Sequence, residues 1–210
     1  MPNRLNCYMA ARSLVITFFI FGLVNSVSAQ ISNPALRDEL LAMEKVDQAE
    51  REKCNSGSAE ARAKCYVEIS ERVDKSNTRR LEQIFETHGF PGRKLVGLEG
   101  VRAFMLLLQH APDDRLREKC EKPIERAFKA KELLPQDYSS FIDRFRLHQG
   151  KGQLYGTGFE MKDGKMVLSK TEDIKNLEKR RKKIGLPPLS EYIQMLKDAY
   201  RLQVETPVLK

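Results

Sequence analysis

The stretch Val101–Ala111, VRAFMLLLQHA, is apolar on nearly every side until its last residues. Its composition predicts a helix from about Leu98 to Ala111, and a helix that is apolar all round is normally central to its fold. The run ends in Gln109 and His110, which are costly to bury without hydrogen-bond partners. We therefore expect this helix to lie in the core and to meet a polar cleft at its C-terminal end.

Amphipathic segments on both sides of this stretch predict further helices. Their apolar spacing indicates helices over residues 34–53, 61–87, 113–134, 136–148, 172–184 and 191–202. Asp163-Gly164 separates the segments Gln153–Met161 and Lys165–Leu168, which is typical of a β-hairpin. The expected fold class is mainly α: a single-domain helical bundle of about six to seven helices with one small β-hairpin near residues 153–169.

The N-terminus has the pattern of a secretory signal peptide. Arg4 and Arg12 precede an apolar run, and small residues lead to Ala29, where we predict cleavage. The run is shorter than the roughly 18–20 residues that span a bilayer, so no membrane span is expected after signal cleavage. We expect residues 1–29 to be the signal peptide, residues 30–210 to form one mainly helical domain, and the protein to be exported, periplasmic or extracellular.

The cysteines and the charge add to this prediction. Cys54 and Cys65 enclose a turn-forming Asn-Ser-Gly-Ser; on one helix they would lie about 16 Å apart, but a reversed chain allows a disulfide bond. Cys120 is then unpaired. Removing the two arginines of the signal peptide lowers the net charge from +8 to +6. This basic protein lacks a nucleic-acid motif, so nucleic-acid binding is not expected, while binding to an anionic surface stays possible.

Several charged side chains fall on apolar helix faces. They are Asp47, Arg51, Asp74, Arg181 and, at a helix end, His110. Burying each one alone costs several kcal/mol, whereas groups that meet can share hydrogen bonds. We therefore expect them to converge on a polar cleft. The alternatives are that Asp47 and Arg51 form a surface ion pair and that Asp74 lies at the flank of its stripe, facing water.

Two loops carry weaker signals. His88-Gly-Phe-Pro-Gly92 ends a helix and leaves an imidazole at its C-terminus. The glycines around Thr157 in the predicted strand suggest a bulge or the close approach of a ligand, or a simple strand bend. The chain has no phosphate-binding loop pattern, no H-E-x-x-H and no G-x-S-x-G, so nothing names a reaction.

Six short motifs together resemble those of a bacterial family known as a domain of unknown function. In chain order they are Asp47-Gln48-x-x-Arg51, His88-Gly-Phe-Pro-Gly92, Gln109-His110-Ala111, Asp143-Arg144, Gln153-x-Tyr155-Gly156-Thr157 and Arg180-Arg181-x-x-x-Gly185-Leu186. Phe90 stands where that family usually has tryptophan, and Gly158 where glutamine is expected. The resemblance implies a shared fold and a shared polar cluster, and it implies no activity.

The leading hypothesis is an exported enzyme, of hydrolase or lyase type, that uses a polar cleft. The candidate catalytic residues are His110, His88, Asp47 and Asp143, because a histidine oriented by a carboxylate suits proton transfer near neutral pH. The candidate substrate-binding residues are Arg51, Gln109, Arg144, Gln153, Tyr155, Thr157 and Arg181. No metal site is predicted, the cofactor is unknown, and the partner is an unknown small molecule or envelope polymer. The alternative is a non-catalytic envelope module whose buried polar network fixes helix packing.

Overall fold

The apolar stretch forms the helix α4 (Arg93–Gln109), which lies at the centre of the main hydrophobic core. The computed structural model describes residues 31–162, 164–200 and 203–206, so the predicted signal peptide lies outside the described residues. Val101, Phe104 and Leu108 of α4 are 0% exposed. α4 starts earlier than predicted, because Gly97 adopts a positive φ of 70° and joins the helix to a short preceding turn.

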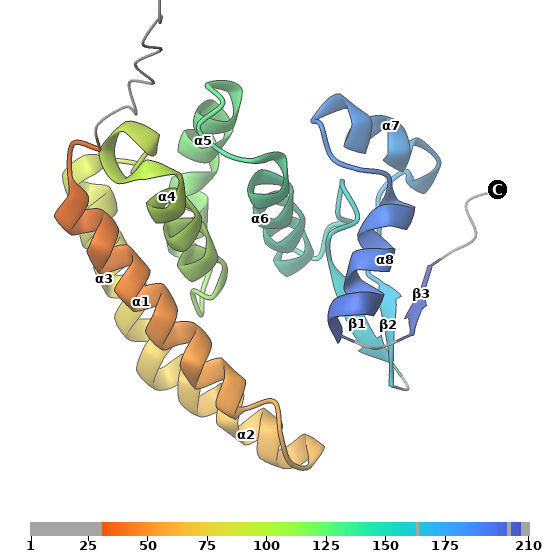
Figure 1. Cartoon of the computed structure of the whole chain (residues 1–210). Helices are drawn as coiled ribbons and strands as arrows, with labels where there is room; N and C mark the ends of the chain where they lie inside the picture. Colours follow the sequence, from red (N-terminus) through yellow and green to blue (C-terminus); the bar gives the residue numbers. More distant parts are fainter. Residues whose placement is uncertain (1–30, 163, 201–202, 207–210) are drawn as a thin grey trace, which may run out of the picture.

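Two long helical segments flank α4. The helix α1 (Pro34–Lys53) packs along it and has the predicted bounds. The helix α2 (Ala59–Ile69), the π-helical turn η1 (Ser70–Asp74) and the helix α3 (Lys75–His88) follow one another as a single rod beside α1 (Figure 1). The sequence predicted this rod as one regular helix over residues 61–87; the π turn in its middle is a correction.

The next two helices complete the core. The helix α5 (Arg115–Lys129) continues through Pro123, and it ends before the predicted residue 134 because Lys131 has a φ of 61°. The helix α6 (Pro135–His148) packs against both α4 and α5. Figure 1 shows α6 in the middle of the molecule, with α1 to α4 on one side and the sheet on the other.

The β structure begins later in the chain than predicted, and it contains a third strand that was not predicted. The strands β1 (Phe159–Lys162) and β2 (Lys165–Leu168) form the antiparallel hairpin, and β3 (Val204–Glu205) adds a parallel strand beside β2. Residues 153–158 form a loop, apart from a single bridge from Gln153 to Thr171, so the predicted start of the hairpin at residue 153 is wrong. The physical reason is that the buried carboxylate of Asp143 accepts hydrogen bonds from the backbone of this loop.

The C-terminal part covers the sheet. A 3-10 turn η2 (Ile174–Asn176) precedes the short helix α7 (Leu177–Lys183), and the helix α8 (Leu189–Tyr200) follows. Leu168, Leu177 and Leu189 form a second apolar cluster beneath these elements. The predicted mainly α fold is confirmed, and the predicted hairpin is part of a small three-stranded sheet.

The predicted disulfide bond is present. Cys54, just after α1, is bonded to Cys65 of α2, with 5.5 Å between their Cα atoms. Cys120 is free and buried in the main core. Among the described helices, none is both long and apolar enough to cross a membrane.

Candidate functional site

The first two residues of the candidate site lie on α1. Leu36 and Leu40 of this helix are buried, and further along the same face Asp47 is 0% exposed. Arg51 lies one turn on, with its Nε atom 3.1 Å from Oδ2 of Asp47. Asp47 is fully buried and the Arg51 side chain is 19% exposed, so the interpretation of this pair as a surface ion pair is wrong.

The π turn η1 places the third residue. A π turn inserts an extra residue into a helix and is often found at functional sites. Asp74 ends this turn and points inward, with 7% of its side chain exposed and Oδ1 2.5 Å from Nη2 of Arg51. Asp74 thus faces Arg51. The alternative prediction, that Asp74 lies at the flank of its stripe and faces water, is wrong.

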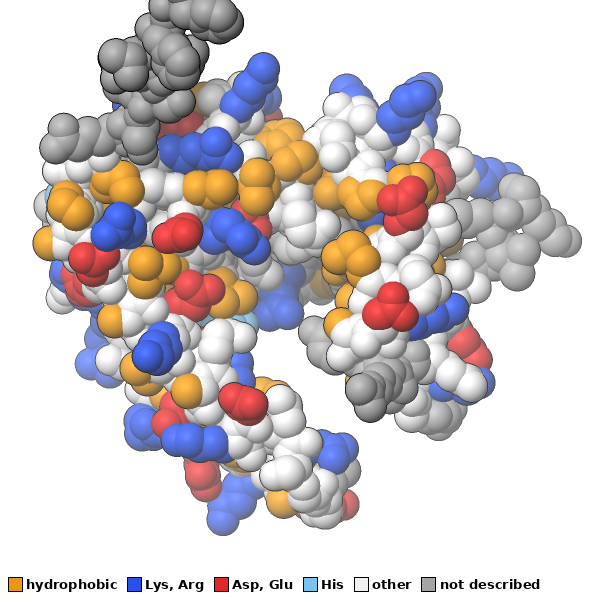
Figure 2. Space-filling model, viewed as in Figure 1, with side chains coloured by type: hydrophobic (Ala, Val, Ile, Leu, Met, Phe, Trp, Pro, Cys, Tyr) orange, Lys and Arg blue, Asp and Glu red, His pale blue; other side chains and the backbone are white. Residues whose placement is uncertain are grey.

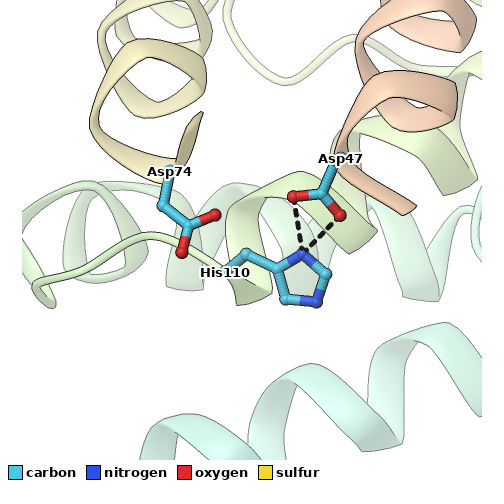
Figure 3. Close-up of side chains that lie close together, drawn as sticks. All are labelled: Asp47, Asp74 and His110. Atoms are coloured by element: carbon cyan, nitrogen blue, oxygen red, sulfur yellow. Dashed lines mark hydrogen bonds and ion pairs between the residues drawn. The ribbon is translucent and has the colours of Figure 1, made fainter. Parts of the chain in front are cut away.

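His110 supplies the fourth group at the end of the central helix. It follows Gln109, the last residue of α4, and its side chain is 15% exposed. Its Nδ1 atom lies 3.0 Å from Oδ2 of Asp47. Figure 3 shows the imidazole turned towards Asp47, while the other ring nitrogen points away from both carboxylates. The polar end of VRAFMLLLQHA therefore meets the buried charges of α1 and η1.

The neighbours of Nδ1 decide which nitrogen of His110 carries the proton. Nδ1 lies 3.0 Å from Oδ2 of Asp47, and Nε of Arg51 approaches it as a donor at 3.1 Å. The single hydrogen on Nε also reaches Oδ2 of Asp47 at 3.1 Å, so Arg51 does not need Nδ1 as its acceptor. A deprotonated Nδ1 would direct its lone pair at a carboxylate that is fully ionised and buried. We therefore assign the proton to Nδ1, which donates to Asp47, and this leaves Nε2 as a free acceptor.

The pKa values of the two buried aspartates are shifted in opposite directions. Burial alone raises the pKa of Asp47, but hydrogen bonds from His110 and Arg51 outweigh it and bring the pKa to about 2. Burial raises the pKa of Asp74 above its ordinary value, despite the attraction of Arg51. Asp47 is thus the permanent anion that orients His110, and Asp74 holds the far side of Arg51.

Three of these residues are also the best candidates for a metal site in the described part of the chain. One ligand atom each of Asp47, Asp74 and His110 lies within 4.8 Å of the others. However, Nη2 of Arg51 donates to both carboxylates, at 3.2 Å and 2.5 Å, so a guanidinium already supplies the positive charge between them. This donor set fits an internal ion-pair network better than it fits a bound cation.

A pocket of about 580 Å³ is lined by Gln109, the residue that precedes His110, but not by the four residues of the cluster. It lies between α6 on one side and the sheet with α8 on the other, and on the face drawn in Figure 2 the surface is hollowed between these parts. Three of the predicted substrate-binding residues line it: Gln109, Arg144 and Thr157. Gln109 joins the pocket to the cluster, because it directly precedes His110 in the chain.

Arg144 is the main charge of this pocket. Its Nη1 atom donates to the backbone carbonyl of Gln109 at 3.3 Å, and within the described part of the chain no carboxylate pairs with it. Desolvation inside the concave surface, together with repulsion from Arg117 and Arg51, lowers the pKa of Arg144. An arginine that lacks a carboxylate partner and lies near two others creates a positive site suited to an anion.

Asp143, predicted as catalytic, instead organises the loop that follows α6. Its buried carboxylate accepts hydrogen bonds from the backbone N–H groups of Leu154, Tyr155 and Thr157, at 2.7 to 2.9 Å, and from the Thr157 hydroxyl at 2.8 Å. Burial raises its pKa even so. Four donors directed at one carboxylate bend the chain into a loop where alternation predicted a strand.

Three more predicted substrate-binding residues also make internal contacts. The Gln153 side chain is 0% exposed and bonds Gly158, Ser169 and Thr171. Arg181 is likewise 0% exposed; it donates to the carbonyls of Pro187 and Tyr155 and lies over the Tyr192 ring. Tyr155 is half-buried beside Tyr138. The expected convergence thus occurs in two places, and the structure does not bring Arg181 and Asp143 to His110.

His88 lies outside both clusters. It is exposed at the end of α3, and its side chain makes no hydrogen bond or ion pair with the described residues. The turn that follows it has a structural role: the Glu132 carboxylate accepts from the backbone N–H of Arg93 at 3.0 Å, and a Cβ on Gly92 would lie 1.8 Å from that carboxylate. Gly92 therefore lets Glu132 cap the start of α4.

Sequence reasoning missed Arg117, a buried arginine that contacts His148 of the pocket. Arg117 is 1% exposed; its Nε atom lies 2.6 Å from Oδ1 of Asp114 and its Nη2 atom 3.1 Å from Nδ1 of His148. The sequence did indicate that Arg117 is buried, because it shares a helix face with Cys120 and Ile124, which are buried. The same pattern was used to predict that Arg181 is buried. His148 lies one turn after Arg144 on α6 and lines the same pocket.

Comparison with known proteins gives a family without an activity. A family model described as a family of unknown function, DUF6624, matches residues 34–205, a range that contains both clusters and the pocket. No curated protein and no solved structure matches the chain.

Proposed function

Because this chain belongs to DUF6624, a family of unknown function, we propose its function from the site: an exported enzyme that binds an anionic substrate at Arg144 and moves a proton with His110. The observation that carries the proposal is a guanidinium without a carboxylate partner among the described residues, which donates to the carbonyl of Gln109, the residue before an imidazole oriented by a buried aspartate. Asp47 is the positioning residue, and Arg51 neutralises the buried carboxylates.

His110 has the features of a general base. Asp47 holds the proton on Nδ1, so Nε2 is free to accept a proton from water or from a carbon or hydroxyl of the substrate. An anion at Arg144 would hold the substrate near this nitrogen. Proton abstraction from water leads to hydrolysis and abstraction from carbon leads to elimination, so the hydrolase and lyase types both remain within the proposal.

Export is part of the proposal. It is supported by the disulfide bond between Cys54 and Cys65, which forms and persists in oxidising compartments, and by the signal peptide predicted for residues 1–29. The proposed location is periplasmic or extracellular, and the proposed ligand is a small anion or an anionic group of an envelope polymer.

A second function is favoured by a specific observation. Asp47, Arg51, Asp74 and His110 bond to one another across α1, η1 and α4, so the cluster also ties three helices together. In a non-catalytic envelope module this would be its whole purpose. Both functions predict that His110→Ala lowers stability, because the change removes a partner of buried Asp47. Stability alone therefore does not separate them, and binding and turnover must be measured.

The test uses two probes and matched variants of the secreted chain. Inorganic phosphate and acetate are titrated while backbone and arginine side-chain NMR signals are recorded. We expect the largest shifts at Gln109, Arg144 and Thr157, and their loss in Arg144→Gln. Arg126→Gln is the control, because Arg126 is exposed on α5 and does not line the pocket. Binding that survives Arg144→Gln overturns the anion site.

Turnover is tested with chromogenic carboxylic and phosphate esters, and with uronic-acid polymers whose elimination products absorb in the ultraviolet. His110→Gln should abolish any activity found, whereas His88→Gln, which changes an exposed imidazole outside both clusters, should leave it unchanged. Activity that persists in His110→Gln contradicts the catalytic role. Arg144-dependent binding without turnover of any of these compounds favours the non-catalytic module.

A further inference from the structure

The pocket contains a second imidazole, His148, which the proposed function leaves without a role. We propose that His148 is a ligand-binding residue that donates a hydrogen bond from Nε2–H to the oxyanion group held by Arg144. The inference rests on the proposed anion site and adds to it a second donor. The ligand chemistry is that of a phosphate or carboxylate group, whose several oxygens can accept from both side chains at once.

Hydrogen bonds hold the Arg117 side chain in place. Its Nε atom lies 2.6 Å from Asp114, and its Nη1 atom donates to the carbonyls of Ala111 at 2.7 Å and Leu108 at 3.3 Å. The side chain is 1% exposed, so water does not compete for these positions. Because a guanidinium has only donors, the group that faces its remaining Nη2 must accept.

That group is Nδ1 of His148, at 3.1 Å from Nη2. The contact between Nδ1 and Oδ1 of Asp114 is longer, at 3.3 Å. Unlike Nε of Arg51 beside His110, which also donates to a carboxylate, Nη2 of Arg117 has no other acceptor among the described residues. A proton on Nδ1 would point at the Nη2–H of a buried cation. We therefore assign the proton of the neutral ring to Nε2, which makes His148 the tautomeric opposite of His110.

The two donors, Arg144 and His148, line the same pocket. Arg144 and His148 are four residues apart on α6, so their Cβ atoms lie about 5–6 Å apart on one helix face, and both line the pocket. Arg144 and Arg117 also approach the same backbone oxygen, that of Gln109, at 3.3 Å and 3.5 Å. An oxyanion on Arg144 thus lies within reach of a hydrogen bond from His148.

The chain offers a clean experiment, since its three histidines are His88, His110 and His148. Long-range ¹H–¹⁵N correlation spectra at mildly alkaline pH report the tautomer of each ring, and His→Gln variants assign the signals. We expect Nδ1–H for His110 and Nε2–H for His148. An Nδ1–H tautomer at His148 overturns the inference whether or not the protein is an enzyme.

Titration then tests the contact itself, with inorganic phosphate and acetate as separate arms. His148→Ala should weaken the binding of the preferred probe about tenfold, as expected for one hydrogen bond to a charged group, and His148→Gln should restore part of it through its amide N–H. His88→Ala is the control. If Arg144-dependent binding is intact in His148→Ala, the inference fails and the proposed function stands. If neither probe shifts Arg144 or His148, both fail.

Discussion

The Nδ1 atom of His110 lies 3.0 Å from Oδ2 of Asp47, although the two residues are 63 positions apart in the chain. The contact joins the end of the most buried helix to the most buried charge of α1. Because the carboxylate is fully covered, its orientation of the imidazole is not weakened by water. The same contact both ties the fold together and prepares Nε2 for chemistry, and each consequence can be measured.

Asp47 should make the fold sensitive to acid. Its pKa is about 2 in the folded protein, compared with about 3.9 for an unfolded aspartate. A pKa lowered by folding stabilises the protein above the unfolded value, and this contribution is lost as the pH falls through the folded value. About 2 kcal/mol of the free energy of unfolding should therefore disappear between about pH 4 and pH 2.

Urea unfolding of the wild type and of Asp47→Asn over this range measures the effect. The wild type should lose more stability on acidification than the variant does, so the two curves should converge. Asp74 has a raised pKa and contributes with the opposite sign in both proteins. Because the Asp47 charge causes part of that shift, the difference between the two curves is a lower bound for the contribution of Asp47. Asp38→Asn, at an exposed position of α1, is the control. Parallel curves for wild type and Asp47→Asn would show that the carboxylate is not held as described.

We predict that Asp143 holds the loop in place and takes no part in proton transfer. Asp143→Asn removes one acceptor oxygen from a set of four donors, so we expect a loss of about 2–3 kcal/mol in stability. Hydrogen exchange should accelerate at the amides of Leu154, Tyr155 and Thr157. Thr157→Val, which removes only the hydroxyl donor, should cost about 1 kcal/mol. If Asp143→Asn leaves hydrogen exchange at the three amides unchanged but abolishes anion binding, Asp143 belongs to the binding site instead.

Periodicity predicted much of this arrangement, but only within single helices. Asp47, Arg51 and Arg181 could be placed on buried faces because each continues an apolar stripe. Which groups then meet depends on how the helices pack, so the separation of Arg181 from His110 was not predictable. The π turn that directs Asp74 inward has no signal in residue spacing, and the loop at Tyr155 imitates a strand until the buried acceptor Asp143 is known.

The disulfide bond should stabilise the fold without affecting the pocket. It closes a short loop, with a sequence separation of 11, for which chain entropy gives about 2–3 kcal/mol. The double variant Cys54→Ser/Cys65→Ser should lose this amount and keep its phosphate affinity. In a chain that lacks residues 1–29, alkylation after unfolding without reductant should label only Cys120, whose burial raises its thiol pKa to about 12 in the folded state. Labels on Cys54 and Cys65 under these conditions would contradict the bond.

Replacing Arg51 should convert the cluster into a metal site. In Arg51→Met the carboxylates of Asp47 and Asp74 lose the cation between them, while their oxygens and the His110 nitrogen stay within 4.8 Å of one another. Two carboxylates and an imidazole suit a divalent transition metal. Zn²⁺ or Mn²⁺ should therefore raise the melting temperature of Arg51→Met and leave that of the wild type unchanged. Arg79→Met, at an exposed position of α3, controls for the lost charge. If either metal stabilises the wild type equally, a cation can displace the Arg51 guanidinium from between the carboxylates. The cluster would then be a metal site in the wild type as well, and this prediction would be wrong.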